Sequence, residues 1–227
     1  MNLTESMKNV FKNRGTSLLS DFWKEDLRSI LLEVRDDVAH AFNHSDKKLR
    51  PSLSEWKDSA LDALTIIRHS PERVKKGFAY FQDDFLKELE NQKDPKDKAM
   101  FCLKVLGALT SFAINAAYGV RKARVDMYLP GIKNSKSAFT QFLLTELILK
   151  MSRLFIMRFI AEVENQITEP EERKKLSFFK KMLNDNSTQV DDTLEATPGD
   201  KAFEIVESLK TYVMTGKKHD DINRKEI

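Results

Sequence analysis

One group of side chains has the types and spacing of a helical metal site. Asp37, His40 and His44 follow one another at intervals of three and four residues, which places them on one side of a helix. Helical bundles use carboxylates and imidazoles at this spacing to bind metal ions. A di-iron bundle would repeat the motif, but no other histidine here follows an acidic residue by three positions. We therefore expect these residues to form a solvated helix end. A metal-dependent helical enzyme is the second alternative for the function of the chain, after the two functions given below.

The segment 101–120 is largely apolar but carries a line of polar side chains that continues past its end. The line consists of Lys104, Ser111, Asn115 and Lys122, and Tyr118 and several small residues lie beside it. Small residues let another helix approach closely, and buried polar groups need hydrogen-bond partners. A tight helix crossing is therefore our first interpretation. The alternative is the wall of a groove for an apolar ligand with a polar head, with Lys150 and Arg153 contributing to an anion pocket.

The second strongly apolar segment, residues 139–160, also carries scattered charges. Glu146 and Lys150, and likewise Arg158 and Glu162, are four residues apart, so each pair can form an ion pair along a helix. Charges on a nearly apolar helix must be paired or solvated. We expect partly exposed ion pairs where this helix reaches the surface.

Two basic segments could contact an anionic surface. Their candidate residues are Arg121, Lys122 and Arg124 in the first segment and Lys174, Lys175 and Lys180, beside two phenylalanines, in the second. Cations near a helix C-terminus are favoured by the helix dipole alone, which is the simpler interpretation of the first segment. Lysines interleaved with aromatic residues are also typical of helices that lie on anionic membranes.

The composition excludes several other classes of function. The 227 residues include 38 Lys and Arg and 35 Asp and Glu, and a net charge of +3 gives no reason to expect a nucleic-acid partner. Cys102 is the lone cysteine and falls opposite the polar line, so we expect it in the core. The chain has no glycine-rich phosphate loop and no hydrolase or zinc-protease motif, and we expect no cofactor.

Caps, glycines and prolines divide the chain into elements that would position these residues. Only seven glycines and six prolines are present, which favours helices over a β-rich fold. We expect about eight helices, the first of which ends at Gly15: residues 4–14, 20–44, 53–67, 71–89, 95–128, 135–166, 168–183 and 200–215.

The predicted architecture is an all-α, single-domain bundle over residues 1–216, followed by a charged, frayed tail at 217–227. Segments 101–120 and 139–160 are apolar on most sides, so they should lie at the centre with amphipathic helices around them. We expect no signal peptide and no spanning helix, and hence a cytoplasmic location, with peripheral membrane attachment as an alternative. The favoured function is a non-enzymatic module for protein interaction or self-association. The alternative is binding of an apolar ligand or an anionic membrane surface.

Overall fold

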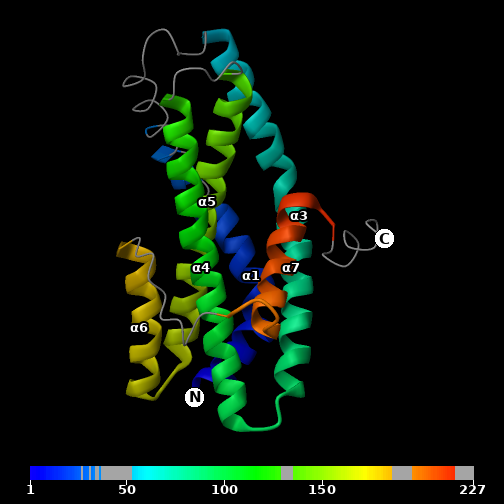
Figure 1. The fold of residues 1–227 in the computed structure, drawn as a ribbon. Coiled ribbons are helices and arrows are strands. Elements are labelled where there is room, and N and C mark those ends of the chain that lie inside the picture. The colour runs from blue at the N-terminus through cyan, green and yellow to red at the C-terminus, as the bar shows by residue number, and fades with distance from the viewer. Residues whose placement is uncertain are drawn as a thin grey trace.

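A computed structural model describes residues 1–26, 28–30, 32–33, 36, 53–128, 135–185 and 196–217. Within these ranges the regular secondary structure is entirely helical, and the elements form one compact arrangement (Figure 1). The helices are α1 (Leu3–Glu25), α3 (Leu53–Asn91), α4 (Pro95–Tyr128), α5 (Ser135–Gln166), α6 (Pro170–Asp185) and α7 (Lys201–Thr215). The predicted all-α bundle is confirmed.

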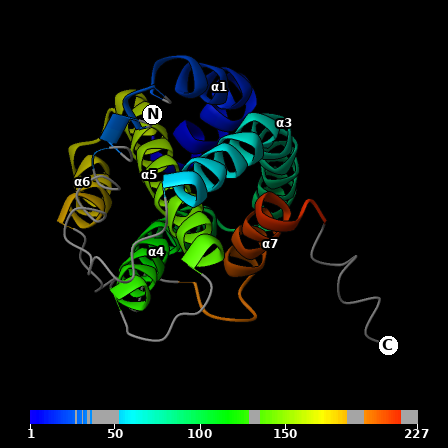
Figure 2. The same ribbon diagram turned by 90° about the horizontal axis from the view of Figure 1, so that it is seen from above.

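The long helices α3, α4 and α5 form the body of the bundle. The most extensive contact joins α4 to α5, and α4 also touches α1, α3, α6 and α7. The shorter helices lie at the periphery, with α6 against α4 and α5, and α7 against α3 and α4. Seen from above, α6 and the α3–α7 pair occupy different sides of the bundle (Figure 2).

A cluster of phenylalanine rings joins three helices in the core. The Phe11 ring of α1 lies 4.3 Å from the Phe85 ring, 5.4 Å from the Phe81 ring and 5.0 Å from the Phe159 ring, measured between ring centroids. The apolar segment of α4 is buried from Phe101 to Leu103 and again from Val105 to Leu106, as predicted. The centre is thus built from α4 and α5 together with phenylalanines of α1 and α3.

Local capping groups set several helix ends where the sequence predicts them. The Lys96 backbone N–H donates to Asp94 Oδ1 at 2.7 Å, which caps the start of α4. Asp200 caps α7 by accepting from the Ala202 N–H at 3.1 Å. Gly216 ends α7 with φ at 74°, in the left-handed region that glycine adopts without steric cost.

The prediction that the first helix stops at Gly15 is wrong, because α1 continues to Glu25. Gly15 is buried, and a Cβ there would lie 2.9 Å from Phe78 Cε1. The glycine therefore allows α1 and α3 to approach closely and does not terminate the helix. Asp26 follows as the C-cap, so the predicted helix over residues 20–44 is interrupted there.

The predicted break at Pro71 is also wrong, since α3 runs without interruption from Leu53 to Asn91. A proline inside a helix removes one backbone hydrogen bond and costs about 3 kcal/mol. Contacts of α3 with α1, α5 and α7 are spread over a long helix and outweigh this local cost.

Polar pairs hold α1 along α5. The Asn9 amide donates to Gln166 Oε1 at 2.7 Å, and Arg14 Nε lies 3.2 Å from Glu162 Oε1. Arg158 donates to Asp26 Oδ1 and to Glu25 Oε2, both at 2.8 Å, and these hydrogen bonds raise the pKa of its guanidinium. The predicted Arg158–Glu162 pair within one helix is therefore replaced by pairs that join two helices.

Candidate functional site

The candidate metal residues Asp37, His40 and His44 lie outside the described residues. Within the part of the chain that is described, no three His, Cys, Asp or Glu side chains are arranged to hold a metal ion. The metal hypothesis therefore stays a prediction from spacing.

The Lys104 end of the polar line on α4 is a contact between two helices. Lys104 Nζ forms an ion pair with Asp200, the residue that also caps α7. Ser111 is partly buried further along α4, whereas the side chains of Asn115, Tyr118 and Lys122 lie outside the described set. At this end the cation of the line joins α4 to the start of α7, and the predicted tight crossing at Ser111 and Asn115 stays a prediction.

The cations proposed for an anion pocket are directed to different elements. Lys150 Nζ lies 3.0 Å from Glu33 Oε2, and Arg153 Nη2 donates to the Asn184 carbonyl near the end of α6 at 2.9 Å. Lys104, by contrast, is held by Asp200. The three cations thus bind three different acceptors, and the described contacts do not bring them together in one anion pocket.

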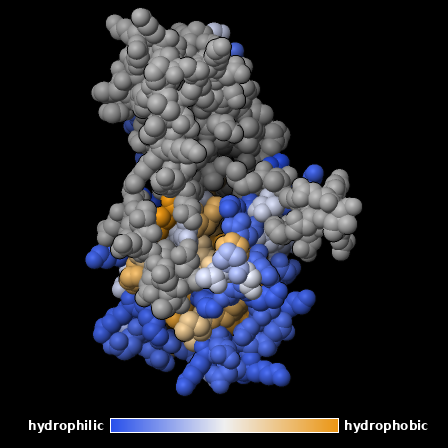
Figure 3. Space-filling model, in the orientation of Figure 1, coloured by the Kyte–Doolittle hydropathy of each residue, from blue (hydrophilic) through white to orange (hydrophobic). Residues whose placement is uncertain are grey.

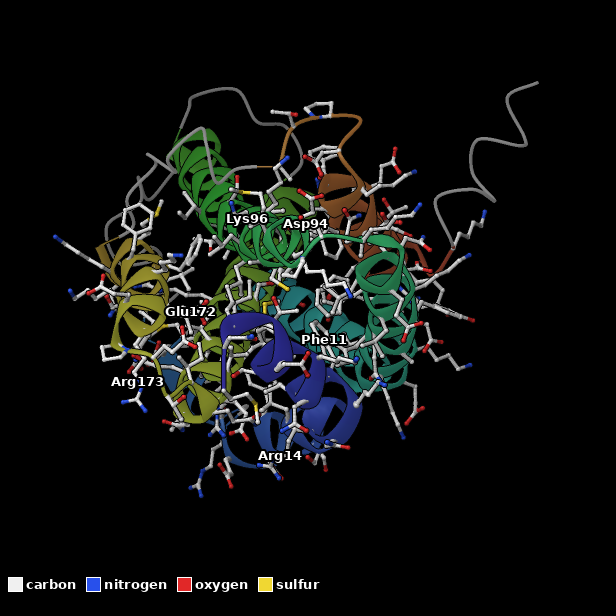
Figure 4. The ribbon with its side chains drawn as sticks, turned by 90° about the horizontal axis from the view of Figure 1, so that it is seen from below. Phe11, Arg14, Asp94, Lys96, Glu172 and Arg173 are labelled. Atoms are coloured by element: carbon white, nitrogen blue, oxygen red, sulfur yellow. The ribbon has the colours of Figure 1, made fainter. Side chains whose placement is uncertain are left out.

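Helix α6 has a buried face and an exposed face. Its buried face consists of Leu176, Phe179, Met182 and Leu183. Glu172 lies between α6 and the start of α1, where its carboxylate accepts from the Leu3 N–H, whereas Arg173 lies on the outer side (Figure 4). The inner side of α6 therefore contributes both apolar packing and a polar tie to α1.

The lysines of α6 divide between these two sides. Lys180 lies on the boundary and reaches Glu164 of α5 at 2.7 Å, with 35% of its side chain exposed. Lys174 is 72% exposed and pairs with its near neighbour Glu171 at 2.6 Å, and Lys175 and Lys181 are also exposed. The side chains of Arg121, Lys122 and Arg124, at the end of α4, lie outside the described set.

Phe178 stands at the middle of the outer side of α6 with 39% of its side chain exposed. Lys174 precedes it by four residues, Lys175 by three, and Lys181 follows by three, which places all three beside the ring on the helix surface. We call Lys174, Lys175, Phe178 and Lys181 the α6 outer face. The residue predicted for this surface is Lys180, whereas the structure places Lys181 on it. The spacing of the apolar residues Leu176, Phe179 and Leu183, which are buried, is the signal that separates the two lysines.

A shallow notch lies between α3 and α7 on another side of the bundle. The rings of Tyr80 and Tyr212 meet edge to face there, with centroids 5.1 Å apart. Its lining also includes Gly77, Asp84 and Leu209, and it has room for about one water molecule. No sequence pattern predicts this notch, because its two tyrosines come from helices far apart in the chain.

Cys102 is a core side chain, as predicted. It has no exposed surface, and burial is the main cause that raises the pKa of its thiol from 9.0 to about 12. A hydrogen bond with Thr4 lowers this pKa by less, and the nearby Glu172 and Glu5 carboxylates raise it slightly further. The thiol is therefore protonated at neutral pH and packs as a small apolar group.

The visible surface in Figure 3 is mostly hydrophilic over its described lower part, with apolar residues showing between charged ones. Among the described residues, no helix combines the length and apolar character needed to cross a membrane. Comparisons with protein-family models, with curated protein sequences and with solved structures find no match to this chain.

Proposed function

We propose that this chain is a helical interaction module that pairs with a second copy of itself through the face formed by α3 and α7. The observation that carries the proposal is the tyrosine notch. Tyr80 is 38% exposed yet already packs against Tyr212, so its ring is held in place before a partner arrives. Tyrosines are enriched at the centres of protein interfaces.

The charges on either side of Tyr80 favour a second copy as the partner. Lys76 precedes Tyr80 by four residues and Asp84 follows it by four, and both are exposed. A two-fold contact places residue i of one copy against residue j of the other, and j against i. If two α3 helices cross antiparallel at Tyr80, Lys76 of each copy therefore faces Asp84 of the other.

Sedimentation velocity over a range of protein concentrations tests this proposal. The wild-type chain should form a dimer, and Tyr80→Ser should raise the dimer dissociation constant about thirtyfold, as expected for a central interface residue. Circular dichroism should show that Tyr80→Ser retains its helices, because the ring is not part of the buried core.

Charge reversal gives the sharper control. Lys76→Asp alone and Asp84→Lys alone should each weaken the dimer, because each places like charges opposite each other. The double variant should recover most of the wild-type affinity. A chain that stays monomeric at every concentration, or a double variant weaker than either single one, would contradict the proposal.

A further inference from the structure

The α6 outer face combines an exposed phenylalanine with three exposed lysines, and the packing of the bundle does not explain this combination. The helix lies at the edge of the structure, against α4 and α5 (Figures 1 and 2). Its buried face holds the apolar residues needed for that packing, including Leu176 and Phe179. Phe178 is nevertheless 39% exposed, although its ring contacts the Phe179 ring edge to face, with centroids 5.8 Å apart.

The cations around Phe178 are weakly engaged. Lys174 and Glu171 form an exposed pair within one helix, and such a pair contributes little and exchanges readily with solvent. Lys175 and Lys181 are exposed on either side of the ring. In contrast, Lys180 is held by Glu164, and the Nε of Arg173 donates to the Ile167 carbonyl at 2.7 Å.

We propose that the α6 outer face binds the surface of an anionic lipid bilayer. A phenylalanine can enter the region between headgroups and acyl chains, while flanking lysines keep their ammonium groups among the headgroups. Anionic lipids present a diffuse negative charge that long, mobile lysine side chains match without fixed geometry. This combination of one exposed ring and three flanking cations supplies both an apolar and an electrostatic contribution from a single helix face.

The same features favour a bilayer over an acidic protein. Recognition of a fixed carboxylate or phosphate is best served by the planar fork of arginine. On α6 the Nε of Arg173 donates to the Ile167 carbonyl, and the cations that flank Phe178 at three and four residues are lysines. An acidic protein would also leave Phe178 without an apolar environment unless it offered a matching pocket. The inference goes beyond self-association and does not depend on it, because α6 and the α3–α7 pair lie on different sides (Figure 2).

Vesicle co-sedimentation at low salt tests the proposal with the full chain. Vesicles of phosphatidylcholine and phosphatidylserine in equal parts should bind the protein, and vesicles of phosphatidylcholine alone should not. Each lysine near an anionic surface contributes a factor of about five, so the triple variant K174Q/K175Q/K181Q should lose about a hundredfold in affinity. Phe178→Ser should lose severalfold while retaining the salt dependence.

The matched control removes the same charge elsewhere. Lys75, Lys93 and Lys96 are exposed on α3, after it and on α4, and the variant K75Q/K93Q/K96Q should bind nearly as wild type. Equal loss in both triple variants would overturn the proposal, since net charge would then explain binding. Absence of binding to the anionic vesicles, or equally tight binding of soluble polyglutamate, would also overturn it. The Tyr80→Ser variant should bind as a monomer, which separates this result from that of the dimer experiment.

Discussion

The two sides of α6 show how one residue step along a helix changes a side chain's role. Phe178 and Phe179 are adjacent and identical in type, yet Phe178 is 39% exposed and Phe179 is fully buried. Lys174 and Lys180 differ in the same way, because the first pairs on the exposed surface and the second reaches Glu164 on α5. The inner side packs against the bundle, whereas the outer side is exposed to solvent.

The largest expected effect comes from truncating the inner phenylalanine. Phe179→Ala should lower the free energy of unfolding by about 3–5 kcal/mol, because it removes a fully buried ring and leaves a cavity. Phe178→Ala should change it by about 0.5 kcal/mol or less. Urea denaturation of the two variants measures the difference, and equal losses would mean that the two sides of α6 are not distinct.

Removal of the inner carboxylate should have a smaller effect. Glu172→Ala deprives the Leu3 N–H of its acceptor at the start of α1 and should cost about 1–2 kcal/mol. Its neighbour Glu171 is exposed and forms a surface pair with Lys174, so Glu171→Ala should cost about 0.5 kcal/mol or less. Thermal unfolding of both variants compares them directly, and a larger loss for Glu171→Ala would be inconsistent with the placement of Glu172.

The two ion pairs of α6 should differ more modestly. A double-mutant cycle on Lys180 and Glu164 should give a coupling of about 0.5–1 kcal/mol, because the pair is half-buried and joins two helices. The same cycle on Lys174 and Glu171 should give about 0.3 kcal/mol or less, and should vanish at high salt. A stronger coupling on the outer side would show that Lys174 is not available to a partner.

The smallest effect at neutral pH concerns Cys102, whose surroundings include Glu172 on the inner side of α6. Because burial raises the pKa of the thiol from 9.0 to about 12, the folded chain keeps a proton that the unfolded chain loses in this range. The free energy of unfolding should therefore fall as pH rises from 9.0 towards about 12, and the thiol should make no difference to this pH dependence below 9.0.

Urea denaturation on both sides of pH 9.0, compared with Cys102→Ala, isolates this contribution from other groups that titrate there. The alanine variant should lose less stability on the alkaline side. Identical pH profiles for the two chains would mean that Cys102 is open to solvent.

Local chemistry determined a large part of this fold from the sequence alone. The predicted bounds of α4 and α5 agree with the structure, and Asp94, Asp200 and Gly216 act at helix ends that lie within one residue of the predicted bounds. These features depend on residues a few positions apart, so the amino-acid order contains all that is needed. The burial of Cys102 and Phe101 was equally predictable, because the surrounding segment is apolar on most sides.

Tertiary structure decided what depends on residues far apart in the chain. The sequence predicts a helix end at Gly15, but in the structure Phe78 packs against this glycine and the helix continues. The sequence also predicts that Arg158 pairs with Glu162, but in the structure it donates to Asp26 at the end of α1. Likewise, only the packing of α6 on α5 brings Lys180 to Glu164, and only the pairing of α3 with α7 brings Tyr80 to Tyr212. Spacing defines which residues share a helix face, but the neighbour that covers that face is set by the free energy of packing distant segments together.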